Sequence, residues 1–251
     1  MRLLYLLVDE LSPSVEWVDR RLREGQAAMP ESWTFSVEPI RIGPPFYEEN
    51  ALGHAMAVPG IVHAVLKRQH EYDAILIGCF GDPGLAAART VARIPIVGPG
   101  EASLLLARLA ARRFGIATIL RSDIPEMEVN VFALGLGDCC VGIEAIDLPA
   151  DSVLTDPDQT TDALIAAGER LVERGAQVIV LGCMSFGFYP FAAALRKRLG
   201  VEAIDPLRAS IGALQVTATL SIRLGGKAQQ LERPEDLSRF LFQLVGTVAV
   251  S

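Results

Sequence analysis

The sequence lacks most of the features that mark nucleic-acid-binding and exported proteins. It has no block of like charges, and its net charge of −7 argues against nucleic acid or anionic lipid as the main partner. The apolar run after Arg2 is short and no small-residue cleavage site follows it, so we expect no signal peptide. Hydrophobic residues make up 51% of the chain and charged residues 21%, as in an ordinary globular protein.

Long uncharged runs are also scarce. Only residues 178–195 are long and uncharged enough to suggest a membrane span. Gly182, Ser185, Gly187 and Pro190 interrupt this run, so we interpret it as a buried strand, a tight turn and a helix. We therefore expect no membrane partner.

Cysteine and histidine are too few and too scattered to indicate a disulfide framework or a metal site. The four cysteines are Cys79, Cys139, Cys140 and Cys183. No CxxC pair exists and adjacent cysteines rarely suit a disulfide framework, so we expect reduced thiols in the cytoplasm. His63 and His70 can share a helix face, but a packing or surface role is favoured over a metal site. Cys139 and Cys140 are interpreted as structural.

What the sequence does contain is a repeated motif. The run Asp73–Cys79 (DAILIGC) returns as Gln177–Cys183 (QVIVLGC). Each run is apolar and ends in Gly-Cys, a pattern typical of a buried parallel strand that leads into a turn. This repeat indicates that the chain is duplicated.

The segments around the two motifs repeat as well. Helical patterns precede them at residues 52–69 and 158–174, and the second has Thr155 or Asp156 as its cap and Pro157 at its start. Strands are expected in pairs, residues 3–8 with 115–120, 35–40 with 142–147, and 94–97 with 201–204. Strands that alternate with helices at this spacing predict parallel sheets covered on both faces.

We therefore predict an α/β fold of two similar parallel-sheet domains related by internal duplication, with the active site in the cleft between them. The expected domains are residues 1–100 with 207–251, and residues 101–206. Helices at 101–113 and 206–220 connect them, and a helix from Pro234 to about residue 245 is expected to pack on the first domain. The alternative is one continuous doubly wound sheet whose buried strands resemble one another.

Cys79 and Cys183 are the candidate catalytic residues. Both follow a strand at the edge where open parallel sheets bind ligands, and they meet at one cleft if the two halves face each other. A thiolate on one side of an acidic carbon can remove its proton while a thiol on the other side delivers one, which inverts the carbon without a cofactor or a metal. A single Gly-Cys is more often structural, because free cysteine is commonly buried, but the matched pair favours catalysis.

The loop after Cys79 predicts the start of a helix. Asp82 is expected to cap this helix and Pro83 to occupy its first position. Backbone N–H groups there can bind a carbonyl or carboxylate oxygen and favour a thiolate, whereas the Asp82 carboxylate opposes a thiolate. The loop after Cys183 has a similar plan, with the Ser185 hydroxyl as a donor.

These motifs resemble the aspartate/glutamate/hydantoin racemase superfamily, most closely its hydantoin and allantoin racemase branch. The longest match is Ile77–Leu85 (IGCFGDPGL). Supporting matches are Glu101-Ala102-Ser103, Gly43-Pro44-Pro45, Ala57-Val58-Pro59-Gly60, Val180-Leu181-Gly182-Cys183, Ala145-Ile146-Asp147 and Ile204-Asp205, so the resemblance covers about residues 35 to 215. It implies a racemase or epimerase that needs no cofactor and uses Cys79 and Cys183 as its acid–base pair.

The resemblance also implies which residues lie near the substrate. The expected substrate-binding residues are Asp9, Phe80, Gly81, Thr118, Met184 and Ser185. Three segments depart from the branch. Leu7–Glu10 stands where its members have Asn-Pro-Asn-Thr, Met184–Phe186 stands where they have Ala-Gly-Met, and the tail from Gly225 onward differs from their usual ending. An aspartate in the first of these loops repels a carboxylate and can accept from a ring N–H or an amine. The expected substrate is a small carbon acid, either a hydantoin-like ring or an amino-acid derivative.

Two other functions are compatible with the same residues. One is a lyase or a cis–trans isomerase of the same fold that uses one cysteine. The other is a non-catalytic protein that binds a metabolite or assists another protein. The composition also permits a homo-oligomer.

Overall fold

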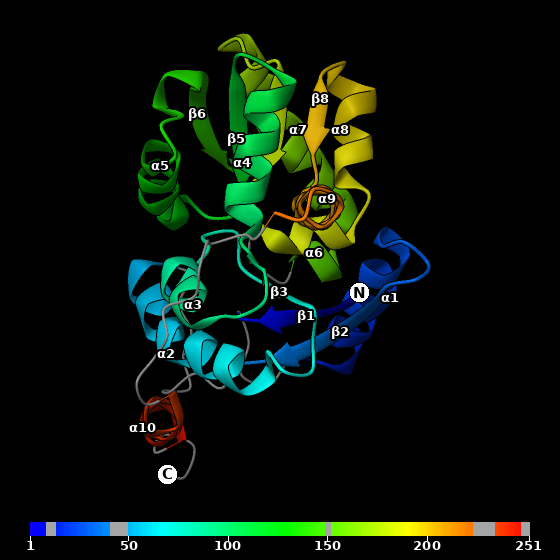
Figure 1. Ribbon diagram of the computed structural model, residues 1–251. Coiled ribbons are helices and arrows are strands. Elements are labelled where there is room, and N and C mark those ends of the chain that lie inside the picture. Colours follow the sequence, from blue (N-terminus) through cyan, green and yellow to red (C-terminus); the bar gives the residue numbers. More distant parts are fainter. Residues whose placement is uncertain (9–13, 41–49, 149–151, 223–233, 247–251) are drawn as a thin grey trace. The chain divides into compact units, whose positions relative to one another are not determined.

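The computed structural model describes residues 1–8, 14–40, 50–148, 152–222 and 234–246. The chain divides into two compact units (Figure 1). Unit 1 consists of Met1–Gly98 and Ile211–Ser251, and unit 2 of Pro99–Ser210. The chain passes from unit 2 back into unit 1 within helix α9, Pro206–Thr219.

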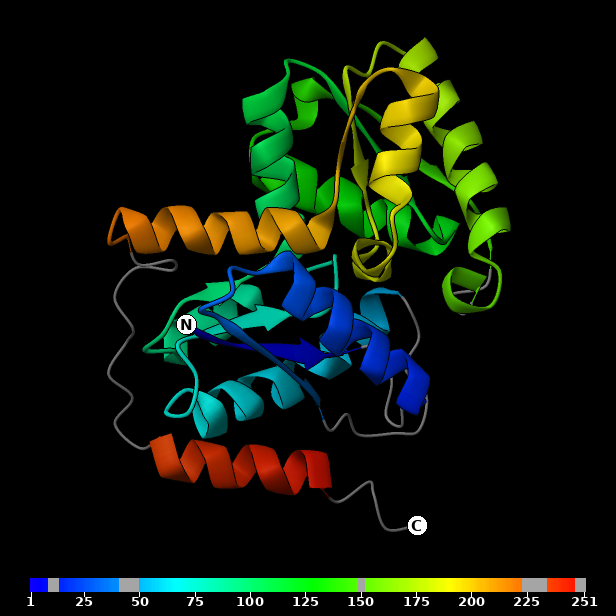
Figure 2. The ribbon, with the colours of Figure 1, turned by 90° about the vertical axis from the view of Figure 1, so that its right-hand side faces the viewer.

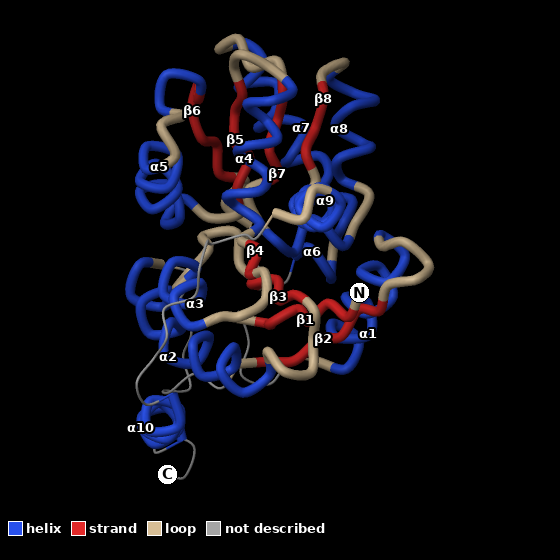
Figure 3. The backbone as a smooth tube through the Cα atoms, viewed as in Figure 1, coloured by secondary structure: helices blue, strands red, loops and turns tan. Residues whose placement is uncertain are grey.

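Unit 1 contains a four-stranded parallel sheet in the order β2-β1-β3-β4 (Figure 3). Its strands are β1 (Arg2–Leu7), β2 (Thr34–Pro39), β3 (Ala74–Ile77) and β4 (Ile96–Val97). The inner strands β1 and β3 are buried on both faces, because every residue from Leu3 to Val8 and from Ala74 to Ile77 is buried. This burial explains why both strands are continuous apolar runs in the sequence.

Helices cover both faces of this sheet. They are α1 (Val15–Ala28), α2 (Ala51–Arg68) and α3 (Leu85–Val91), with α10 (Pro234–Gly246) on the outside. Leu4 and Leu6 point into the core formed with α2 and α3. Tyr5 lies on the opposite face, where its hydroxyl is 3.5 Å from Nε of Arg21 on α1.

Helix α10 packs along α2 (Figure 2), as the sequence predicted for the helix that starts at Pro234. The ring of Phe242 on α10 lies 5.8 Å from that of His63 on α2. His63 therefore has a packing role.

Unit 2 contains a second four-stranded parallel sheet, in the order β6-β5-β7-β8. Its strands are β5 (Phe114–Thr118), β6 (Cys140–Ala145), β7 (Val178–Leu181) and β8 (Glu202–Ile204). Its helices are α4 (Pro99–Ala110), α5 (Ile124–Ala133), α6 (Ser152–Thr155), α7 (Pro157–Glu173) and α8 (Phe191–Leu199). As the sequence predicted, Pro157 starts α7 and the Asp156 side chain caps it, accepting a 2.9 Å hydrogen bond from the backbone N–H of Gln159.

Residues 178–195 form β7, the short 3-10 helix η3 (Met184–Phe188) and the start of α8, as predicted. In the part of the chain that the structure describes, no helix is long and apolar enough to cross a membrane.

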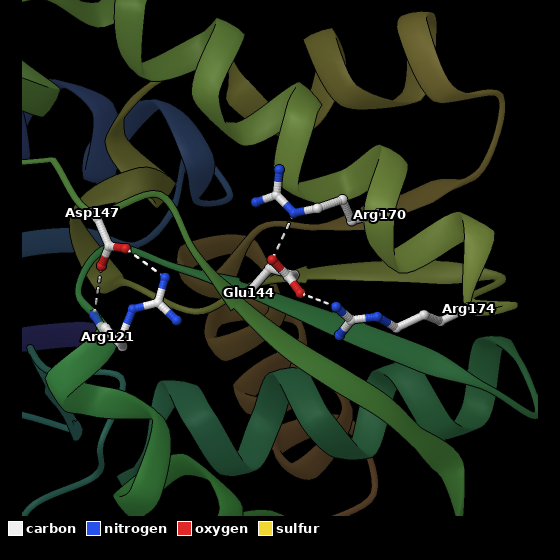
Figure 4. A network of polar contacts seen from close by, with 5 residues as sticks. All are labelled: Arg121, Glu144, Asp147, Arg170 and Arg174. Carbon is white, nitrogen blue, oxygen red and sulfur yellow. Dashed lines mark hydrogen bonds and ion pairs between the residues drawn. The ribbon is translucent and has the colours of Figure 1, made fainter.

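The two sheets share one topology, which confirms the α/β fold with two similar parallel-sheet halves. The likeness extends to side chains. Glu38 near the end of β2 pairs with Arg68 at the end of α2, and Glu144 near the end of β6 pairs with Arg174 directly after α7 (Figure 4). The same pairing at the same place in each unit is the mark of a duplicated scaffold.

The sequence placed one of the paired strands, residues 115–120, one residue too late in the second half. Leu3 pairs with Ala74 in the first sheet, and Phe114 pairs with Val178 in the second. Leu3 therefore corresponds to Phe114 and not to Gly115. Apolar residues continue past the carboxyl ends of β1 and β5, at Val8 and at Ile119-Leu120, so hydrophobicity alone does not fix the register.

Candidate active site

The first candidate turn follows β3 in unit 1. The N–H of Gly78 donates to the carbonyl oxygen of Leu6 at 2.8 Å, and the Gly78 carbonyl accepts from the Tyr5 hydroxyl at 3.2 Å. A Cβ atom at position 78 would lie 2.4 Å from the Leu6 oxygen, so this position requires glycine. The turn holds Cys79, which is half-buried, directly beyond the carboxyl end of the strand.

The thiol of Cys79 contacts a histidine that the sequence reasoning missed. Its Sγ lies 3.3 Å from Nε2 of His54, a buried residue in the first turn of α2. Gly81 makes room for this ring, because a Cβ atom at position 81 would lie 2.5 Å from its Cε1. The Asn50 side chain caps α2 by accepting hydrogen bonds from two backbone N–H groups. Because this cap fixes where the helix begins, it also fixes the direction in which His54 points, toward the cysteine.

The predicted helix start after Cys79 was wrong. Asp82 does not cap the helix, because its φ is +53° and the N-cap of α3 is Gly84, with φ +67°. The chain first makes two tight turns. The N–H of Asp82 donates a hydrogen bond to the carbonyl oxygen of Cys79, and the N–H of Leu85 donates one to the carbonyl oxygen of Asp82, both at 3.1 Å. Aspartate tolerates the left-handed region, so an Asp-Pro pair that resembles a cap can form a turn instead. Phe80, within these turns, is buried.

The second candidate turn follows β7 in unit 2 and repeats the backbone of the first. The N–H of Gly182 donates to the carbonyl of Ala117 at 2.7 Å. Thr118, the buried last residue of β5, donates its hydroxyl to the Gly182 carbonyl at 3.2 Å. Cys183 is half-buried at the start of η3, and Met184 and Ser185 within η3 are buried.

A carboxyl group lies beside the second turn. Asp205 follows β8 at the same edge of the sheet, and a Cβ atom at Gly187 of η3 would lie 3.0 Å from its Oδ1. Burial raises the pKa of Asp205 to about 6, although the backbone N–H and the charge of Arg208 act to lower it. The sequence pointed to this residue only through the family match at Ile204-Asp205, because the burial of its carboxyl group cannot be deduced from the residues next to it.

The other two cysteines lie at the amino end of the strands of the second sheet, opposite the end that carries Cys183. Cys140 begins β6 and Cys139 ends the 3-10 helix η2 (Gly137–Cys139), whereas Cys183 comes after the last residue of β7. Burial raises the pKa of Cys140, whose thiol donates to the Gly142 carbonyl at 3.6 Å. None of these four described cysteines forms a disulfide.

The predicted site residues thus fall into two groups, one in each unit. Unit 1 brings together Cys79, Phe80 and Gly81, and unit 2 brings together Thr118, Cys183, Met184 and Ser185. Asp9 and the Gly43-Pro44-Pro45 loop lie outside the described residues. Among the residues that the structure does describe, no three His, Cys, Asp or Glu side chains are grouped so that they could hold a metal ion.

Comparisons with known proteins agree with this architecture. The sequence profile described as Asp/Glu/Hydantoin racemase matches residues 19–214. The hydantoin racemase of Rhizobium meliloti is 36% identical over 165 residues, which are 65% of this chain and 68% of that protein. The hydantoin racemase of Pseudomonas sp. (strain NS671) is 33% identical over 208 residues, or 82% of this chain and 80% of that protein.

Solved structures show the same fold. Allantoin racemase from Klebsiella pneumoniae has a TM-score of 0.79 and 25% sequence identity, and the match covers 94% of this chain and 98% of that one. Glutamate racemase from Francisella tularensis has a TM-score of 0.60 at 12% identity, covering 96% of this chain and 94% of that one. At 12% identity the likeness concerns the fold alone.

Proposed function

The chain belongs to the Asp/Glu/hydantoin racemase family and is a racemase; from this premise we propose that Cys79 and Cys183 are the two acid–base groups that invert one stereocentre of its substrate. The observation that carries the proposal is the pair of equivalent turns. In each unit a Gly-Cys follows the same strand of the sheet, the glycine N–H bonds to the neighbouring strand, and the thiol is half-buried. Ligands of open parallel sheets bind at this edge.

The proposed reaction moves two protons and no other group. A cysteine thiolate takes the proton from the acidic carbon on one side, and the electron pair of the broken C–H bond passes into the adjacent carbonyl. The second cysteine then gives its thiol proton to the opposite side of the planar carbon. In the reverse direction the two cysteines exchange roles, so no cofactor takes part. Hydrogen bonds to the carbonyl oxygen stabilise the carbanion.

We propose a hydantoin ring with one substituent at C5 as the substrate. The C5–H bond lies next to a carbonyl, and the proteins with the matched sequences are named hydantoin racemases. The loop residues Phe80, Gly81, Met184 and Ser185, together with Thr118 and Asp9, would surround the ring, which is small and largely planar. A cytoplasmic location and a homo-oligomeric state stay predictions.

The direct test follows the stereocentre in D₂O. Enantiopure 5-isopropylhydantoin is incubated with the full chain, and polarimetry and proton NMR record the rotation and the C5 hydrogen together. We expect rotation to decay while deuterium enters C5. If neither this hydantoin nor allantoin changes faster than in buffer alone, the proposed substrate class is wrong.

Replacement of either cysteine tests the proposed pair. We expect Cys79→Ser and Cys183→Ser each to lower the racemisation rate by about 10²–10⁴-fold, because a serine hydroxyl is a much weaker acid–base group at neutral pH. Cys139→Ser and Cys140→Ser are matched controls, because these half-buried thiols lie at the amino end of the strands of the second sheet, away from Cys183. Full activity in either Cys79→Ser or Cys183→Ser would refute the two-cysteine mechanism.

A further inference from the structure

We propose that His54 accepts the thiol proton of Cys79 and thereby prepares the thiolate that acts as base. This inference rests on the proposed function, because it assigns a source to the thiolate that the reaction needs. A free thiol is mostly protonated at neutral pH, so a proton acceptor beside it increases the share of the reactive form. His54 is a positioning residue here, since it acts on the substrate only through Cys79.

The geometry brings donor and acceptor into direct contact. Nε2 of His54 lies 3.3 Å from the sulfur of Cys79, within hydrogen-bonding distance for sulfur. The ring is buried, and Gly81 presents its bare backbone to the imidazole. The ring therefore has little freedom to turn away, and the contact is held by helix α2 on one side and the turn on the other.

The proton step is balanced within the pair. The S–H bond of Cys79 breaks and an N–H bond forms at Nε2 of His54, while the electron pair stays on the sulfur. The product is a thiolate beside an imidazolium, which the new N–H···S⁻ hydrogen bond stabilises. Nothing enters or leaves the protein in this step.

Within the described residues, the elements that carry the pair contain few other charged side chains. In α2, residues 51–66 contain no acidic or basic side chain besides His54 and His63. In the turn, the Asp82 carboxylate packs against Gly98, where a Cβ atom would lie 2.5 Å from its Cγ. On α3, Arg89 donates from Nε to the Ile96 carbonyl at 3.1 Å.

The duplicated fold itself does not require this histidine. The equivalent ion pairs of Arg68 and Arg174 align α2 with α7, which places Thr160 at the position of His54. Thr160 is buried, and its hydroxyl donates to the carbonyls of Ser152 and Asp156 at 3.2 and 3.0 Å. A small hydroxyl residue therefore fits the same position of the fold in unit 2, so the imidazole beside Cys79 is a feature that distinguishes unit 1.

The test measures thiol reactivity without any substrate. The full chain and His54→Gln are treated with iodoacetamide at pH 6.5 and pH 9.5, and peptide mass spectrometry gives the alkylation rate of each cysteine. We expect the Cys79 rate in His54→Gln to fall about tenfold at pH 6.5 and less than twofold at pH 9.5, where solvent ionises the thiol unaided. The Cys183 rate in the same sample is the internal control and should not change.

Two further variants separate proton transfer from packing. Gly81→Ala keeps the imidazole but drives a methyl group into it, so we expect the same selective loss at pH 6.5. His63→Gln, on the same helix but in ring contact with Phe242, should leave the Cys79 rate unchanged. Equal changes at both pH values in His54→Gln would indicate altered access and overturn the proposal, as would an unchanged rate at pH 6.5.

The two proposals can fail separately. A wild-type chain that shows the His54-dependent alkylation of Cys79 but racemises no hydantoin or allantoin would contradict the proposed substrate class alone. A chain that racemises hydantoins normally with His54→Gln would contradict the role of His54 and leave the two-cysteine reaction standing.

Discussion

At the scale of single residues, the sequence identified candidate acid–base thiols but not their surroundings. Cys79 and Cys183 stand out because each ends a buried run, and this signal is local. His54 is 25 residues before Cys79 in the chain, and only the phase of α2 against the turn brings the two together. Asp82 shows the opposite error, since its local pattern matched a helix cap while its backbone took the left-handed conformation. Local patterns identify residue types better than they identify contacts.

Asp205 gives a prediction at the same scale. Its pKa of about 6 in the folded chain lies above the ordinary 3.8, because the carboxylate is buried. The folded state thus holds its proton more tightly than the unfolded state, so this contribution to stability is complete below pH 3.8 and is lost as pH rises through 6. Asp205→Asn removes the buried charge and keeps the capping oxygen that accepts from the N–H of Arg208.

We therefore expect Asp205→Asn to be more stable than the wild type at pH 8, on the order of 2 kcal/mol, with the difference shrinking toward pH 4. Urea unfolding followed by circular dichroism at the two pH values measures both free energies. A variant that is less stable at pH 8 would mean that the pair with Arg208 outweighs the cost of burial.

At the scale of helices and strands, the sequence predicted the strands of both sheets and most of the helices, but it named no helix at α1 or α5 and missed the exact register. Buried parallel strands are apolar on both faces, so their ends are set by the glycine turns and helix caps and not by alternation. Where a cap has its usual chemistry, as at Asp156, the predicted start of the helix is correct. Where a strand runs on into further apolar residues, as β5 does into Ile119 and Leu120, the predicted position is wrong by one residue.

The ion pairs that join helices to strands yield a prediction for one element contact. Glu144 on β6 accepts from Arg170 at 2.7 Å and also pairs with Arg174 (Figure 4). Burial raises the pKa of Glu144, but the hydrogen bonds and charges of the two arginines outweigh it and lower the pKa below 4.5. The stabilisation is therefore present above pH 4.5 and is lost as pH falls through the lowered pKa.

We expect Glu144→Gln to lower the free energy of unfolding by about 1 kcal/mol at pH 7, because the half-exposed arginines weaken the contact, and by less at pH 3. Asp147→Asn is the matched control in the same unit, because its 2.8 Å pair with Arg121 is exposed on both sides. This control should change stability by less than about 0.5 kcal/mol. A similar loss of stability in both variants would mean that the change in net charge causes it, and not the contact of β6 with α7.

At the scale of the whole molecule, duplication was the most reliable inference from sequence. Two matching Gly-Cys runs predicted two sheets, and both have the same strand order. Each unit has its own buried core, which includes Ile75 in β3 of unit 1 and Ile179 in β7 of unit 2. The domain boundaries and the shared cleft stay predictions.

Equivalent substitutions in the two cores provide a test at this scale. Ile75→Val and Ile179→Val each remove one buried methylene group from matching places, at a cost of about 1 kcal/mol. We expect hydrogen exchange measured by mass spectrometry to accelerate by about fivefold in the strands of the altered unit. Equal acceleration in both units from either substitution would show that the two cores open as one.

The discontinuity of unit 1 has a consequence for synthesis on the ribosome. All four of its strands are made before residue 99, whereas α10 is made after the whole of unit 2. Domains commonly fold as they leave the exit tunnel. The first sheet can therefore form while the side of α2 that contacts α10 is still exposed to solvent. During that interval the nascent chain exposes an apolar helix face to other polypeptides, and α10 is the last described segment able to close it.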